Sequence, residues 1–193
     1  RSGDFMTCDA DESVGKAIEA MRALPSAPLG RLAILGNHDY GRYWQQEGAA
    51  GKLCSELEKL QIQALRNEVT SLGGLQIAGV DDLWTKNFQP EQTLRELATD
   101  RPALVLCHNP DGVDQPAFAD YRGWILAGHT HGGQCKPPFM PPPIASVSNR
   151  RYVAGEYELT GGRRLYINRG LGYAHRVRFN ARPEITVFTL QRA

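Results

Sequence analysis

The chain has 193 residues, of which 41% are hydrophobic and 22% charged, with a formal net charge of +1. These values favour one soluble globular domain and give no strong signal for nucleic-acid binding. No apolar run approaches the roughly 20 residues that cross a bilayer. The four cysteines, at positions 8, 54, 107 and 135, form no Cys-x-x-Cys pair, so we expect reduced thiols.

Predicted helices and strands alternate through the first two thirds of the chain. Apolar spacing predicts helices at 12–24, 48–60 and 90–99, with a short one at 116–121. Strands are predicted at 32–35, 62–65, 103–107 and 124–127, and a hairpin at 69–80 turning at Gly73-Gly74. Further strands are predicted at 152–159, 164–167 and 184–190. This order indicates a layered α/β sandwich with a mixed sheet.

A proline-rich segment at 136–143 interrupts this pattern. Its five prolines predict an extended loop with little regular structure. We expect a surface loop. Because it contains Phe139 and Met140, a lid or a membrane-touching edge are the alternatives.

Polar clusters follow three of the buried-type strands, and four of the five histidines lie in them. The clusters are Asn37-His38-Asp39, His108-Asn109 and His129-Thr130-His131, with Asp4 after a fourth short strand. Ligands of open α/β sheets bind beyond the carboxyl ends of the strands, so we expect one shared pocket. On an extended strand, His129 and His131 would point to the same side.

Aspartate, asparagine and several histidines together suit divalent transition metals. A pair of such ions about 3.5–4 Å apart can clamp a phosphate oxygen and activate a water molecule. Two alternatives remain: incidental surface histidines, or a structural zinc bound by His129, His131, Cys107 and Cys135.

The ordered motifs resemble those of the calcineurin-like metallophosphoesterases. The resemblance rests on Gly3-Asp4, Gly36-Asn37-His38-Asp39, His108 and Gly128-His129-Thr130-His131. The segments Gly132-Gly133-Gln134, 168–172 and Arg178-Phe179-Asn180 resemble the bacterial branch of YkuE- and YaeI-type phosphodiesterases.

The resemblance implies an α/β/β/α sandwich of mixed β-sheets and a metal-dependent phosphoester hydrolase, expected to be a phosphodiesterase. Its centre would hold two divalent ions, manganese, iron or zinc. Asp4 would bridge them, with Asn37, His108 and His129 on one ion and His131 on the other. His38 would lie near the leaving-group oxygen, and Asp39 would orient His38.

One motif of the family is missing from the sequence. The family pattern begins with Asp-x-His before Gly-Asp, and no Asp-x-His occurs in these residues. We therefore expect a single domain over 1–193 that is N-terminally truncated and lacks its first strand. The second ion, left with Asp4 and His131, would bind weakly.

The sequence is compatible with three hypotheses of function. The first is the phosphodiesterase, with a small-molecule or lipid-linked substrate; the second is a single-metal binding module without catalysis. The third is a pyrophosphatase acting on a nucleotide-linked lipid. We expect a protein that is either cytoplasmic or peripheral to the inner membrane. In the second case, the residues upstream of Arg1 would contact the membrane, and their sequence would decide between the two locations. The oligomeric state is not predicted.

Overall fold

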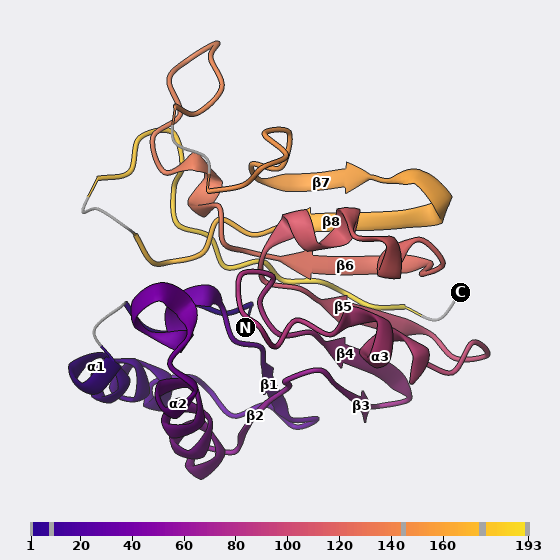
Figure 1. Cartoon of the computed structure of the whole chain (residues 1–193), viewed down its shortest axis with the longest axis horizontal. Helices are drawn as coiled ribbons and strands as arrows, with labels where there is room; N and C mark the ends of the chain where they lie inside the picture. The colour runs from indigo at the N-terminus through magenta and orange to yellow at the C-terminus, as the bar shows by residue number, and fades with distance from the viewer. Residues whose placement is uncertain (1, 8–9, 144–145, 174–176, 192–193) are drawn as a thin grey trace.

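The computed structural model describes residues 2–7, 10–143, 146–173 and 177–191. Two β-sheets lie between helical layers (Figure 1). The small sheet pairs β1 (Arg31–Ala33) in parallel with β2 (Ile62–Ala64), and a parallel bridge joins Ser2 to Ile34 just beyond β1. The large sheet has the order β3-β4-β5-β6-β8-β7.

The large sheet is parallel in its middle and antiparallel at both edges. Its strands are β3 (Glu68–Leu72), β4 (Leu75–Gly79), β5 (Ala103–Leu106), β6 (Gly123–Ala127), β7 (Gly155–Glu158) and β8 (Arg163–Ile167). Strands β4, β5, β6 and β8 run in parallel, and β3 and β7 close the edges as antiparallel partners of β4 and β8. The carboxyl ends of the four parallel strands therefore meet at one edge.

Three apolar clusters hold the layers together. The helices α1 (Ala10–Arg22) and α2 (Glu47–Lys59) cover the small sheet through a core that includes Leu53 and Leu57. Between the sheets, Ile34 belongs to the same cluster as Ile77, and on the outer face of the large sheet Phe118 packs in the cluster that also contacts α3 (Pro90–Arg95). Each fully buried aliphatic side chain contributes about 1.5–3 kcal/mol. The α/β/β/α sandwich is thus confirmed.

Short 3₁₀ helices occupy many of the connections. They are Asn37–Tyr40, Arg42–Trp44, Pro110–Asp114, Pro116–Phe118, His131–Gly133 and Thr160–Gly162. The predicted helix at 116–121 is one of them, and the helix predicted to reach residue 99 ends at Arg95. The other predicted helices and strands through 167 are present, although the strand expected at 152–159 is confined to Gly155–Glu158.

The strand predicted at 184–190 is wrong. Within the described chain this segment has no ladder partner, and its main chain is tied only by the amide of Glu184 to the carbonyl of Gly170, at 3.1 Å. The apolar residues of the alternation point outward, since Ile185 is 77% and Val187 86% exposed. The inward residues are Glu184 and Thr186, whose side chains hydrogen-bond at the end of β8. Side chains rather than a backbone ladder therefore fix this segment.

No helix among the described residues is both long and apolar enough to cross a membrane.

Candidate metal centre

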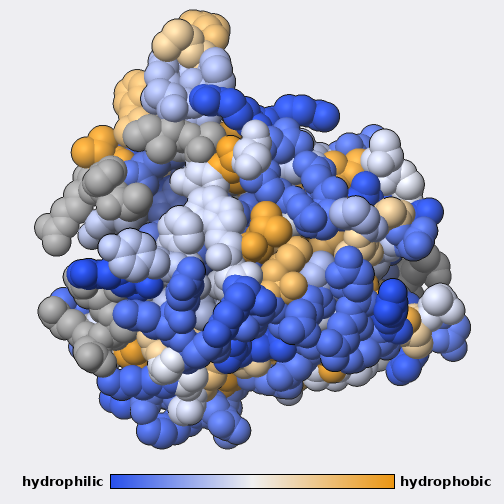
Figure 2. Space-filling model, viewed as in Figure 1, coloured by the Kyte–Doolittle hydropathy of each residue, from blue (hydrophilic) through white to orange (hydrophobic). Residues whose placement is uncertain are grey.

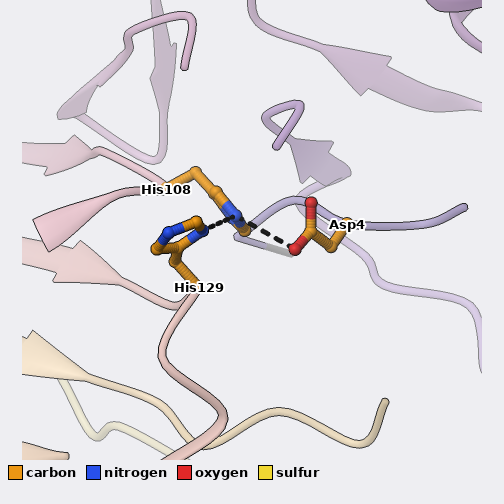
Figure 3. A group of neighbouring side chains, drawn as sticks. All are labelled: Asp4, His108 and His129. Carbon is orange, nitrogen blue, oxygen red and sulfur yellow. Dashed lines mark hydrogen bonds and ion pairs between the residues drawn. The ribbon is translucent and has the colours of Figure 1, made fainter. Parts of the chain in front are cut away.

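Strand ends bring three of the predicted ligands, Asp4, His108 and His129, to one place (Figure 3). Asp4 follows the segment that bridges to Ile34, and Asn37 opens the 3₁₀ helix just beyond β1. His108 and His129 follow β5 and β6, which are neighbouring parallel strands. Parallel pairing aligns the carboxyl ends of these strands, which is why residues far apart in sequence lie side by side here.

Glycines allow the strand ends to approach this closely. A Cβ at Gly3 would lie 2.6 Å from the backbone nitrogen of Gly36 and would also clash with the ring of His108. A Cβ at Gly36 would lie 2.7 Å from the backbone nitrogen of Asp4. Both contacts are too short for any side chain, so these two positions require glycine.

Asp4, His108 and His129 offer ligand atoms that all lie within 4.8 Å of one another. Nε2 of His108 is central: it lies 3.2 Å from Oδ2 of Asp4 and 3.1 Å from Nδ1 of His129. Both histidines are nearly inaccessible to solvent, at 1% and 8% exposure. The group is therefore a compact, buried set of nitrogen and oxygen donors.

The outer nitrogens of both rings face backbone carbonyls. Nδ1 of His108 contacts the carbonyl of Ser2, and Nε2 of His129 lies 2.7 Å from the carbonyl of Ser146. A carbonyl accepts only, so each outer nitrogen must carry a proton. In the neutral rings the lone pairs then lie on the inner nitrogens, which is the arrangement found in histidines that bind metals.

Two inner nitrogens and a carboxylate at these distances need a positive charge between them. Burial disfavours ionised Asp4, but His108 outweighs burial and lowers the pKa of Asp4 below its usual range. Burial also disfavours charged His108, yet Asp4 raises the pKa of His108 to about 9, while burial and the charge of His108 lower the pKa of His129 to about 3. A proton on His108 supplies that charge, and a divalent cation would be bound by the same three atoms.

Asn37 precedes His38, whose amide donates to Asp4, and offers a further amide oxygen on that loop. The side chain of Asn37 is 1% exposed, and neither its oxygen nor its nitrogen has a hydrogen-bond partner among the described residues. A buried amide without partners costs about 1–3 kcal/mol, so native proteins rarely keep one without a ligand. The donor set present therefore fits a divalent metal.

The predicted strand geometry of the two later histidines is wrong. Strand β6 ends at Ala127, and the following turn places His129 and His131 in the left-handed region, with φ of 67° and 51°. His131 lies outside the group of three, and its Nδ1 is 3.3 Å from Oε1 of Gln134. Burial lowers the pKa of His131, and Asp4 opposes this shift. Left-handed backbone costs about 1 kcal/mol or more per residue and concentrates at functional sites.

The side chain of Asp39 ties the 3₁₀ helix after β1 to the segment that follows Asp4. Oδ1 of Asp39 accepts from the amides of Phe5 and Met6, at 2.7 and 2.9 Å, and Oδ2 accepts from Gly36 at 2.9 Å. None of these hydrogen bonds involves the His38 ring that we expected Asp39 to orient. The backbone nitrogen of His38 donates to Oδ1 of Asp4 at 3.2 Å. Asp39 thus positions the loop that carries Asp4.

Asp82 and Trp84 also lie beside the site, and neither was among the predicted site residues. Asp82 is fully buried, and its Oδ2 has no hydrogen-bond partner in the described part of the chain. Burial raises the pKa of Asp82 to about 6, with His108 acting against the rise. The ring of Trp84 meets His129 edge to face, with centroids 4.6 Å apart. An acidic pair after a hairpin is usually solvated, so no local pattern indicates that Asp82 is buried.

A partly buried ionic network supports the Asn37–Tyr40 helix from the large-sheet side. The hydroxyl of Tyr40 donates to Asp81, and Arg66 donates to the Tyr40 oxygen at 2.9 Å. Arg66 also pairs with Glu47 of α2 at 2.9 Å. The network links the two sheets beside the site.

The described cysteines do not enter the metal group. The thiol of Cys107 donates to the carbonyl of Asn109, and Cys54, Cys107 and Cys135 are free. Cys8 lies outside the described residues. The alternative of a structural zinc that includes Cys107 and Cys135 therefore has no support from the described geometry.

Curated relatives match most of the chain. It is 38% identical to the metallophosphoesterase YkuE of Bacillus subtilis over 86% of its length, and 34% identical to the phosphodiesterase YaeI of Escherichia coli over 97%. It is 28% identical to the UDP-2,3-diacylglucosamine pyrophosphatase LpxG of Chlamydia trachomatis over 95%. The chain spans 58% of YkuE, 68% of YaeI and 70% of LpxG. No protein-family model matches it.

These similarities agree with the fold and with the donor set gathered at the strand ends. The region matched to YaeI covers more than two thirds of that protein. The chain belongs to the calcineurin-like metallophosphoesterase superfamily.

Proposed function

We propose that this chain carries the metal centre of a phosphoester hydrolase of the phosphodiesterase type. The observation that carries the proposal is the pair of inward-facing histidine nitrogens beside Asp4, together with a buried Asn37 amide that has no hydrogen-bond partner in the part of the chain that the structure describes. Relatives named metallophosphoesterase and phosphodiesterase support the same reaction class.

Asp4, Asn37, His108 and His129 would hold one divalent ion, and Asp4 with His131 would contribute to a second. Manganese, iron and zinc all suit this mixture of imidazole and oxygen donors. When bound, such ions lower the pKa of water and neutralise charge on phosphoryl oxygens.

The remaining residues position and protonate. His38 follows Asn37 directly, and its backbone is tied to Asp4, so its imidazole is our choice for the proton donor to the leaving-group oxygen. Asp39 holds the loop after Asp4 against the loop after β1, because its carboxylate accepts hydrogen bonds from three backbone amides of these loops. Trp84 covers one edge of His129, which reduces the access of water to that ligand.

The test is the hydrolysis of bis-p-nitrophenyl phosphate by the chain after removal of metal, followed by titration with manganese. We expect turnover that depends on manganese and that falls about a hundredfold or more in His38→Ala. Lys59→Ala, a change at an exposed lysine of α2, serves as the matched control and keeps wild-type turnover. Turnover that resists chelation, or that survives His38→Ala and Asn37→Ala together, would contradict the proposal.

A second candidate is a binding module that holds one metal ion and does not catalyse. It is favoured by the single group of three ligands found among the described residues, which does not include His131. One bound ion per chain without turnover of any phosphoester would support this candidate, and two ions at full occupancy would exclude it.

Two substrate classes suit such a centre, a phosphodiester and a phosphoanhydride. The name of LpxG favours a pyrophosphate bond in a nucleotide-linked lipid, and that of YaeI a phosphodiester. Comparing turnover of bis-p-nitrophenyl phosphate with that of a nucleoside diphosphate-linked sugar lipid separates them.

A further inference from the structure

Two neighbouring loops beside the metal centre expose large apolar side chains. We call residues 134–143 the proline loop, and residues 169–173 together with 177–182 the basic loop. The proline loop presents Phe139, which is fully exposed, and Met140, which is 59% exposed. The exposed apolar residues of the basic loop are Leu171, Tyr173, Val177 and Phe179. Figure 2 shows apolar atoms at the tip of the proline loop, at the top of the view, and on the loop beside it.

Hydrogen bonds join the two loops into one surface. The amide of Lys136 donates to the carbonyl of Phe179 at 2.8 Å, and the amide of Phe179 donates to the carbonyl of Gln134 at 2.9 Å. The side chain of Asn180 adds a bond to the carbonyl of Lys136 at 3.1 Å. The apolar residues of both loops therefore belong to a single face rather than to two independent segments.

The same surface is attached to the metal centre. Nη1 of Arg178 donates to the carbonyl of His131 at 3.3 Å, and Gly132 packs against the side chain of Arg169. Gly133 is in contact with Pro142 of the proline loop. The face thus forms one wall of the turn that carries the later histidines.

The charged side chains that the structure describes in the two loops are all basic. They are Lys136, Arg169, Arg178 and Arg182, and neither loop contains an aspartate or glutamate. Arg169 is paired with Glu184, which lies just beyond the basic loop. The guanidinium of Arg178, in contrast, is bound by carbonyl oxygens of Arg169, Gly172 and Ala181, which leave its charge in place.

Exposed aromatic and aliphatic side chains at a rigid loop tip are unfavourable in water, and their concentration on one face indicates an interaction surface. The prolines on both sides of Phe139-Met140 restrict the backbone, so the tip cannot easily fold back to bury these residues. Cations around apolar side chains match the chemistry of an anionic lipid surface, where lipid phosphates pair with lysine and arginine and apolar side chains enter the acyl boundary.

We propose that the proline loop and the basic loop together dock this protein on anionic lipid bilayers, with Phe139 and Met140 inserted at the interface. Docking through this face would bring the histidine turn to the level of the lipid headgroups. That last consequence rests on the proposed function, because it would present a lipid-borne phosphoester to the site. The docking itself requires neither metal nor turnover.

The experiment is sedimentation of the metal-free chain with vesicles of phosphatidylcholine alone and of phosphatidylcholine containing roughly one-third phosphatidylglycerol. We expect binding to the anionic vesicles that weakens as NaCl is raised, since exposed charges are screened. Phe139→Ser/Met140→Ser should lower partitioning about tenfold or more, because two apolar side chains no longer enter the interface. Lys136→Gln/Arg182→Gln should lower it about fivefold per charge on the anionic vesicles only.

Val187→Ser/Leu190→Ser is the matched control. These two residues are 86% and 69% exposed, as apolar as the loop residues, and lie in the segment that runs toward the C-terminus, away from the proline loop (Figure 1). The control should bind vesicles as the wild type does.

Three results would overturn the proposal. The first is the absence of sedimentation with anionic vesicles at low salt, and the second is an equal loss of binding in the control. The third is a dimer, measured by light scattering, that Phe139→Ser/Met140→Ser converts to a monomer, because a second copy would then be the partner of this face. Hydrolysis is not measured in any arm, so failure here leaves the proposed function untouched.

Discussion

The carboxylate of Asp39 gives the most specific prediction for stability. It is fully buried and accepts hydrogen bonds from the amides of Phe5, Met6 and Gly36. In Asp39→Ala these three amides lose their acceptor. At about 1–3 kcal/mol for each buried group left unsatisfied, the sum lies between about 3 and 9 kcal/mol.

The net loss should lie at the lower end of this range. Burial, together with the charge of Asp4, raises the pKa of Asp39 to about 7, so the carboxylate is itself costly to bury and its removal relieves that cost. We therefore expect Asp39→Ala to lower the free energy of unfolding by about 3 kcal/mol. Asp39→Asn keeps one acceptor oxygen and should lose about half as much.

Urea unfolding of the metal-free chain, followed by tryptophan fluorescence, measures these changes. Asp100→Ala is the matched control, because Asp100 is exposed, and it should change stability by about 0.5 kcal/mol at most. A loss below about 1 kcal/mol in Asp39→Ala, or the same loss in the control, would refute the assigned role of Asp39.

Three further predictions follow from other contacts. Asn37→Ala should lower the free energy of unfolding of the metal-free chain by no more than about 1 kcal/mol and can raise it, because the buried amide has no partner to lose among the described residues. The same change should weaken manganese binding at least about tenfold in calorimetry. Tyr40→Phe should lower the free energy of unfolding by about 1–2 kcal/mol in urea, because Asp81 and Arg66 lose the hydroxyl between them. Burial would raise the pKa of Glu184, but its hydrogen bonds and the charge of Arg169 outweigh burial and lower it. The contribution of Glu184 to the free energy of unfolding is therefore present above the usual glutamate pKa and is lost as the pH falls through the lowered pKa. In Glu184→Gln, the free energy of unfolding should depend less on pH below about 4.5.

The layers of the fold and most of the metal group could be predicted from the sequence. Buried-type strands that each end in a polar cluster specify both the sheet and the edge at which the clusters meet, because parallel pairing aligns those ends. This is why Asp4, His108 and His129 come together as expected.

The remaining differences arise where one chain segment depends on another. The left-handed turn at His129–His131 is set by contacts with the loops beside it, which strand periodicity does not encode. The groups that orient the histidines are the backbone carbonyls of Ser2 and Ser146. Because every residue has a carbonyl, no pattern of side chains in the sequence predicts these contacts. The segment 184–190 has strand composition, but it finds no partner edge within the described structure.

The most direct test of the central claim is the location of a bound metal. Crystals of the chain grown with manganese would be measured near the manganese absorption edge, and an anomalous difference map would be calculated. We expect a peak bounded by Asp4, Asn37, His108 and His129 that is lost in His108→Ala. A peak elsewhere, or a fully ordered site without any peak at saturating manganese, would contradict it.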